Sequence, residues 1–125
     1  MNAIQERAQE AFGTGQIEPR TEGMEAALST LVAAAFGLDL AAVRSRRRGA
    51  DVSFARQVAM YLAHTRLALS YAAAGRLFGR DRTTARHACR QVEERREDPR
   101  VDGLLDCLER AVDLSADLAR FGGRR

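Results

Sequence analysis

The stretch SYAAAGRLFGRDRTTARHACRQVEE, from Ser70 to Glu94, predicts two helices joined by a tight turn. Apolar residues of the first helix recur at spacings of three, four and seven, which puts them on one face: Tyr71, Ala74, Leu77 and Phe78. Gly79 breaks this period, as a residue that tolerates positive φ does after a helix end. Asp81 can then cap the second helix by accepting from the backbone N–H of Thr83 or Thr84. The pattern is that of a helix-turn-helix.

The second helix has two unlike faces. One is a narrow apolar stripe of small residues, which allows close packing: Ala85, Ala88, Cys89 and Val92. The other is cationic and hydroxyl-rich: Arg82, Thr83, Arg86, His87 and Arg90. Arginine and threonine suit phosphate oxygens and base edges. The alternative is a solvated arginine-rich face, in a chain whose basic residues are all arginine, but the pattern favours DNA binding.

A second basic feature is the run RSRRRGADVS, from Arg44 to Ser53. Its clustered arginines repel one another too strongly for a buried helix. One interpretation is a solvated loop. The other is an arm that enters the minor groove of DNA, where the negative potential is deepest at narrow A·T-rich stretches.

Two motifs at a fixed spacing resemble a known family. RQVAMYLA at Arg56–Ala63 and FGRDRTTARHACRQVE at Phe78–Glu93 resemble the C-terminal DNA-binding domain of the bacterial replication initiator DnaA. That family shows Arg-Gln-x-Ala-Met-x-Leu, then Phe-Gly-Gly-Arg-Asp-His-Thr-Thr-Val leading into His-Ala-Cys-Arg. The resemblance covers roughly Ala26 to Leu108.

The resemblance implies roles for individual residues. Base reading falls to Arg48 in the minor groove and to three residues at the start of the second helix: Asp81, Arg82 and Thr83. Backbone contact and positioning fall to a larger set: Arg44, Arg46, Arg47, Arg56, Gln57, Arg80, Thr84, Arg86, His87 and Arg90. The fold it implies agrees with the residue patterns: an all-α, compact helical bundle with a basic loop before the central helix.

This chain departs from the family pattern at several positions. The turn has one glycine fewer than the commonest form, and Arg82 replaces the motif histidine. Phe54-Ala55 replaces an Arg-Pro pair, and Ala50 and Asp51 follow the basic loop where the family is more basic. We therefore expect a weaker loop contact, one lost phosphate contact, and a changed base preference at Arg82.

Charge is distributed unevenly along the chain. Residues 44–96 hold thirteen arginines against four acids, a net charge of +9. Residues 1–43 carry −4 and residues 97–125 carry −2, so the whole chain has only +3. A localised basic field is what a polyanion-binding surface needs.

The remaining elements complete one domain. A helix from Glu25 is ended by Gly37, and Ser53 is expected to cap a helix through Leu69 with Arg56 and Gln57 in its first turn. Asp98-Pro99 begins a last helix, which closes the core over the first. We expect a flexible arm at 1–23, the DNA-binding domain at 24–119 and a frayed tail at 120–125.

Several classes are disfavoured. No segment reads as a signal peptide or a membrane span, and the expected location is the cytoplasm, with the nucleoid. Cys89 and Cys107 lack zinc-ligand spacing and are expected to be buried reduced thiols on apolar stripes. His64 and His87 have no catalytic partner, and no GxxxxGK[ST] loop is present. We expect no enzyme activity, no cofactor and no metal.

The leading hypothesis is a sequence-specific double-stranded DNA-binding protein that regulates transcription. One alternative is a modulator of replication initiation that binds initiator boxes or the initiator itself. A second is a protein-interaction module, with replication or transcription proteins as partners. The apolar stripe of the last helix continues through Leu114, Leu118 and Phe121, to pack on the arm or on a second copy; because it is short, a monomer is favoured.

Overall fold

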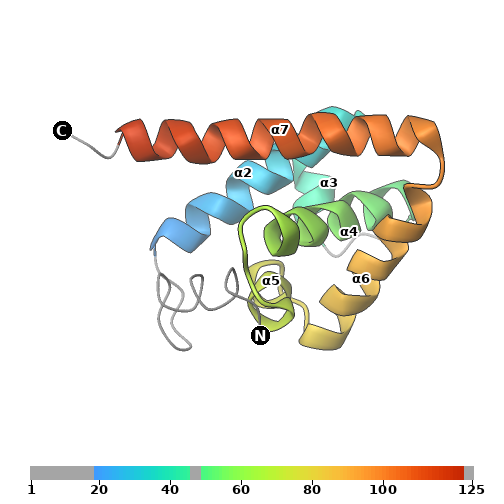
Figure 1. Ribbon diagram of the computed structural model, residues 1–125. Helices are drawn as coiled ribbons and strands as arrows, with labels where there is room; N and C mark the ends of the chain where they lie inside the picture. Colours follow the sequence, from blue (N-terminus) through green and yellow to red (C-terminus); the bar gives the residue numbers. More distant parts are fainter. Residues whose placement is uncertain (1–18, 46–48, 123–125) are drawn as a thin grey trace.

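The computed structural model describes residues 19–45 and 49–122, and the described residues form helices and no strands (Figure 1). The helices are α2 (Pro19–Phe36), α3 (Leu40–Arg44), α4 (Ala50–Thr65), α5 (Tyr71–Leu77), α6 (Arg82–Arg95) and α7 (Pro99–Gly122). The predicted all-α bundle with a helix-turn-helix is confirmed, with α5 and α6 as its two helices.

Helix α4 lies at the centre of the bundle and contacts α2, α3, α5 and α6 (Figure 1). Its side chains Val58, Ala59 and Leu62 are fully buried. The core face of this segment consists of five buried residues: Phe54, Val58, Tyr61, Leu62 and Leu69.

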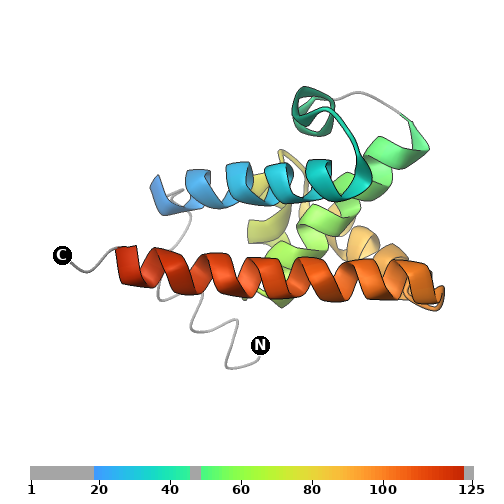
Figure 2. The ribbon, with the colours of Figure 1, turned by 90° about the horizontal axis from the view of Figure 1, so that it is seen from above.

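Helix α7 runs beside α2 along one side of the molecule, as the two views show (Figures 1 and 2). Its residues Leu105, Leu108 and Val112 are buried, which confirms that the last helix closes the core over the first. Ser115, one turn further along α7, is exposed. The buried stripe therefore ends at Val112, and the rest of α7 extends past the core.

Two predicted helix ends depend on glycines with positive φ. Gly37 has φ 65° and Gly79 has φ 69°. After each glycine, the next N–H reaches back to the last turn: Leu38 donates to Ala33 O at 2.8 Å and Arg80 donates to Gly75 O at 2.8 Å. These bonds are those of the Schellman motif, in which a residue without Cβ reverses the chain at low cost.

The bounds of α4 correct the sequence prediction. The helix begins at Ala50 after Gly49, so Ser53 is not its N-cap; the Ser53 N–H already donates to Gly49 O at 2.9 Å. Arg56 and Gln57 consequently lie in the second turn and not the first. Gly49 adopts φ 147°, which lets the helix start earlier than a capping side chain would indicate.

The same helix ends at Thr65 and not at Leu69. Ala68 takes φ 60°, and the Leu69 N–H donates to Ala63 O at 3.2 Å, so the chain folds back over the helix end. This turn buries Leu69 and leaves Ser70 to cap α5, where its Oγ accepts from the Ala73 N–H at 3.1 Å.

Two further expectations change. Helix α2 begins at Pro19 and α7 continues to Gly122, so helix extends into both segments predicted as arm and tail; residues 1–18 and 123–125 lie outside the described residues. Cys89 and Cys107 are both free, and Cys89 is buried as predicted, but Cys107 is exposed because it lies away from the inward stripe of α7. Within the described ranges, no helix has the length and apolar character needed to cross a membrane.

Candidate nucleic-acid interface

The start of α6 is fixed by Asp81. Its Oδ1 accepts from the Thr84 backbone N–H at 2.8 Å, which confirms the predicted N-cap. Hydrogen bonds from the backbone and side chain of Thr84 hold the pKa of the Asp81 carboxyl below its usual value. The carboxylate is therefore ionised at neutral pH and has one oxygen already committed to the helix.

The inner side of α6 packs closely because its residues are small. Ala85 and Ala88 are 0% and 1% exposed and lie against Met60 of α4. Tyr71 and Phe78 of the helix-turn-helix cover the same cluster. The predicted apolar stripe of α6 is confirmed, since Cys89 and Val92 are also buried.

Gly75 sets the approach of α5 to the turn, and the sequence reasoning did not identify it. A Cβ at this position would lie 2.6 Å from Asp81 O and 2.8 Å from Arg80 O. Only glycine fits so close to backbone atoms. The sequence did contain one indication of this role, because glycine is unfavourable inside a helix and Gly75 lies inside a seven-residue one.

The outer side of α6 is open. All five of its predicted residues are exposed: Arg82, Thr83, Arg86, His87 and Arg90. Among the residues that the structure describes, these guanidinium groups make no hydrogen bond or ion pair. Arg82 to Arg90 spans about 12 Å along the helix axis, at a rise of about 1.5 Å per residue. The face is therefore a cationic strip whose donors remain available for a ligand.

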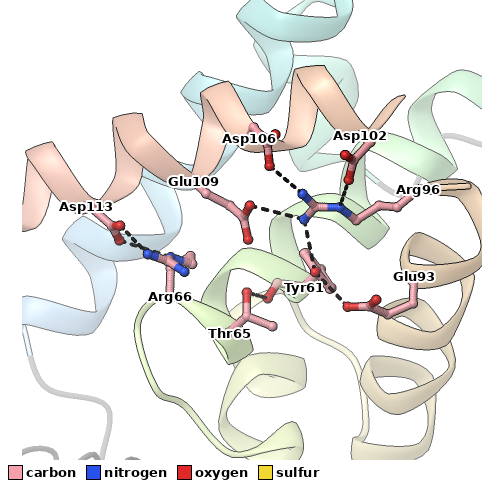
Figure 3. Close-up of polar contacts among 9 residues, drawn as sticks. All are labelled: Tyr61, Thr65, Arg66, Glu93, Arg96, Asp102, Asp106, Glu109 and Asp113. Atoms are coloured by element: carbon pink, nitrogen blue, oxygen red, sulfur yellow. Dashed lines mark hydrogen bonds and ion pairs between the residues drawn. The ribbon is translucent and has the colours of Figure 1, made fainter. Parts of the chain in front are cut away.

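Arg96, at the end of the same helix, differs from these arginines because its guanidinium is paired with acids (Figure 3). Its guanidinium donates to Asp102 Oδ1 at 2.6 Å, Asp106 Oδ1 at 2.7 Å and Glu109 Oε1 at 3.1 Å, all on α7. Burial acts to lower the pKa of Arg96, but the hydrogen bonds to Asp102, Tyr61 and Glu109 outweigh it, so the pKa is raised. Sequence reasoning missed this residue, since the pattern on α6 does not show where the acids of α7 lie.

Tyr61 of α4 joins the same network (Figure 3). Its hydroxyl donates to Glu93 Oε1 at 2.7 Å and accepts from Arg96 Nη1 at 3.2 Å. Burial and the bond to Glu93 raise the pKa of Tyr61 to about 12. The carboxyl end of α6 is thus tied to both α4 and α7.

Arg56 was expected to hold a phosphate at the first turn of its helix. In its second-turn position the guanidinium instead donates to Val43 O at 3.0 Å and Ala42 O at 3.1 Å, at the end of α3. Burial and the nearby charge of Arg80 lower the pKa of Arg56. Arg56 therefore holds α3 against α4, with part of its cationic surface still beside Arg80.

The remaining predicted DNA-contact residues differ in their exposure and in their partners. Gln57 and Arg80 are half-buried and Thr84 is exposed. Arg44 is exposed but pairs with Glu25 of α2 at 2.5 Å, which offsets part of its charge. Arg46, Arg47 and Arg48 lie outside the described residues, so the structure neither joins them to the α6 face nor separates them from it.

Residues 26–92, more than half of the chain, match the family of the bacterial DnaA protein helix-turn-helix. The chromosomal replication initiator protein DnaA of Thermodesulfovibrio yellowstonii is 36% identical over 83 residues, covering 65% of this chain and 19% of that protein. The same protein of Burkholderia multivorans is 37% identical over 83 residues, covering 65% of this chain and 16% of that protein. The chain thus spans less than a fifth of the length of these curated relatives. No solved structure matches it. The helix-turn-helix geometry and the family match agree, and the chain belongs to the bacterial DnaA helix-turn-helix family.

Proposed function

We propose that this chain binds double-stranded DNA in a sequence-specific manner and acts as a transcriptional regulator in the nucleoid, without cofactor or catalysis. The observation that carries the proposal is the open cationic strip on α6. Arg66 and Arg96 are paired with acids of α7, whereas Arg82, Arg86 and Arg90 are exposed without such partners in the described part of the chain. A helix of this kind fits the major groove of B-DNA.

The N-terminal end of α6 is the base-reading part of this proposal. Arg82 and Thr83 are exposed beside the Asp81 cap, and the exposed Asp81 carboxylate is placed to accept from a cytosine N4 amino group. Thr84, Arg86, His87 and Arg90 contact phosphates along the strip. Arg48 reads the adjacent minor groove, and Arg44, Arg46, Arg47, Arg56, Gln57 and Arg80 position the backbone.

Arg82 gives the proposal a specific base preference. Arginine binds guanine O6 and N7 through two hydrogen bonds, worth ~1–3 kcal/mol of discrimination against other bases. The family resemblance places a histidine at this position, so we expect the preferred site to differ from the ordinary origin box at that base. Selection of bound sites from random duplexes tests this, and an unchanged origin box among the selected sites would contradict it.

A modulator of replication initiation is the second candidate. It is favoured by the relatives, which are named chromosomal replication initiator proteins. Footprinting on origin fragments and promoter fragments in parallel separates the two. Protection confined to an origin supports the replication role, and protection of promoter sites supports the regulator.

A protein-interaction module on the same scaffold is the third candidate. Binding through ~5–8 phosphate contacts weakens steeply with added salt, because each contact releases condensed counterions. An apolar protein interface would show little salt dependence. A flat response between low and physiological salt would exclude DNA binding through the α6 strip.

Single substitutions test the residue roles. Thr83→Ala and Arg48→Ala should reduce specific binding while leaving the circular dichroism spectrum unchanged. Arg56→Ala should weaken binding to all sequences alike, and because Arg56 also holds α3 against α4, urea unfolding of this variant must be compared with that of the wild type. Equal loss of sequence preference from all three variants would mean that reading and positioning residues have been assigned wrongly.

A further inference from the structure

Helix α7 carries a second apolar stripe besides the one that faces the core. Leu104, Cys107, Ala111, Leu114 and Leu118 recur at alternating intervals of three and four residues, the spacing by which one helix packs along another. The inward stripe is separate from it: Val101, Leu105, Leu108 and Val112. We call the first set the outer seam.

The outer seam is exposed along most of its length. Leu114 and Leu118 are 59% and 61% exposed, and two of the three large hydrophobic side chains exposed in the described residues are these leucines. Cys107 is exposed, and Ala111 and Leu104 are half-buried, with Leu104 also touching the core. Paired leucines left in water at this spacing indicate a surface that another helix covers.

We infer that the outer seam is the contact between two copies of this chain, which pair through α7 in antiparallel orientation. A two-fold axis between Val112 and Asp113 sets Cys107 opposite Leu118 of the second copy. The same axis sets Ala111 opposite Leu114 of the second copy. Each pair combines a small side chain with a large one, so the two seams interlock without a void.

Charge complementarity selects the antiparallel orientation. In this register Arg110 lies next to Asp117 of the second copy, and the symmetry repeats the pair on the other side. Arg110 is exposed and has only a contact with Cys107 Sγ at 3.4 Å, with no acidic partner among the described residues. Within the described part of the chain, Asp117 pairs with the exposed Arg120 on its own helix and with no other arginine. A parallel arrangement would face Arg110 with Ser115 and provide no ion pair.

The pairing leaves the DNA-binding proposal untouched in each copy. The outer seam belongs to α7, whereas the open strip belongs to α6, whose N-terminal end lies across the molecule from α7 (Figure 1). Substitutions in the seam should therefore change the assembly without changing the affinity of one copy for one site. The two proposals can fail independently.

Disulfide trapping tests the register on the full chain. Leu118→Cys places a thiol opposite the native Cys107 of the second copy, and mild oxidation should give a covalent dimer on a non-reducing gel. The wild type should not cross-link, because two Cys107 thiols lie about 16 Å apart along the axis at a rise of about 1.5 Å per residue, beyond the reach of a disulfide. The double variant Cys107→Ser with Leu118→Cys is the matched control and should stay uncross-linked. Cross-linking of the wild type or of the control would overturn the antiparallel register.

Sedimentation equilibrium tests the pairing without new thiols. The wild type should form a species of twice 13.7 kDa as its concentration rises. Arg110→Asp should weaken this dimer by about tenfold, since it makes two exposed pairs repulsive, and adding Asp117→Arg should restore it. Leu114→Asp should abolish the dimer, whereas Leu40→Asp, at an exposed leucine of α3, should leave it intact. A wild type that stays at 13.7 kDa up to its solubility limit, or a charge exchange that restores nothing, would overturn the inference.

Discussion

The guanidinium of Arg96 meets three carboxylates of α7, whereas that of Arg90 on the same helix meets none within the described residues. Arg56 differs from both, because its guanidinium donates hydrogen bonds to the backbone carbonyls of Ala42 and Val43. Arginine is abundant throughout the middle of the chain, so residue type does not separate these roles. The element packed against each guanidinium decides whether it stabilises the fold or remains available to a phosphate.

The capping carboxylate of Asp81 gives a prediction about pH. Because its pKa is lower in the folded state, the stability that it contributes is complete above the ordinary carboxyl pKa and is lost as the pH falls through the lowered value. Urea unfolding of the wild type should therefore lose more stability between neutral and strongly acidic pH than Asp81→Asn does. Asn keeps an acceptor for the Thr84 N–H without the charge, so the two proteins should converge at low pH. If the free energy of unfolding changed with pH in the same way for both proteins, the charge of Asp81 would contribute nothing to stability.

At the scale of helices, Gly75 determines how closely α5 meets the turn before α6. Gly75→Ala would force a Cβ against the backbone oxygens of Arg80 and Asp81, and we expect a loss of about 1–3 kcal/mol, as for other overpacked sites. Gly103→Ala in α7 is the matched control. Apart from its chain neighbours and the backbone of its own helix, no atom of the described residues lies within 4 Å of its Cβ position, so the substitution should stabilise the chain by about 0.4–1 kcal/mol through the unfolded state. Urea unfolding measures both, and similar values for the two variants would refute the close approach.

The bridge from α4 to the end of α6 can be tested at Tyr61. Tyr61→Phe keeps the buried ring but removes the hydroxyl that bonds Glu93 and Arg96, which should cost about 1 kcal/mol near neutral pH. Because the folded-state pKa is raised to about 12, the wild type should also lose stability above the ordinary tyrosine pKa, and the variant should lose less. Urea unfolding at neutral and at alkaline pH measures the free energy of unfolding of the wild type and of Tyr61→Phe. A variant with the same alkaline loss as the wild type would rule out this assignment.

Local patterns predicted most of the elements, because caps, glycines and apolar periodicity act within a few residues. The Asp81 cap, the Gly79 turn and the buried stripe of α6 are of this kind, and all are confirmed. The early start of α4 was missed because Gly49 begins the helix through its backbone angles and not through a capping side chain. Gly75, Arg96 and the acids of α7 were missed for another reason. Their roles depend on which helices meet in space, and a single helix pattern contains no such information.

Over the whole molecule, most ion pairs among the described residues join different helices. The carboxylates Asp102, Asp106 and Glu109 of α7 neutralise Arg96, and Asp113 neutralises Arg66 (Figure 3). Among the described residues, the arginines that stay exposed without an acidic partner include Arg82, Arg86 and Arg90 of α6. A modest net charge of +3 for the chain thus conceals a strongly polarised surface.

This polarisation predicts which arginines set the salt dependence of DNA binding. Arg90→Gln removes a phosphate contact of the open strip, so the slope of log K against log salt should decrease in magnitude by about 0.9. Arg110→Gln removes the same charge from α7, away from the strip, and should leave the slope unchanged within error. Both residues are exposed, so neither substitution should disturb the fold. Fluorescence anisotropy on one duplex across a salt series measures the slopes. Equal changes in the two variants would mean that DNA responds to the overall charge of the protein, and that the α6 strip has no privileged contact with the duplex.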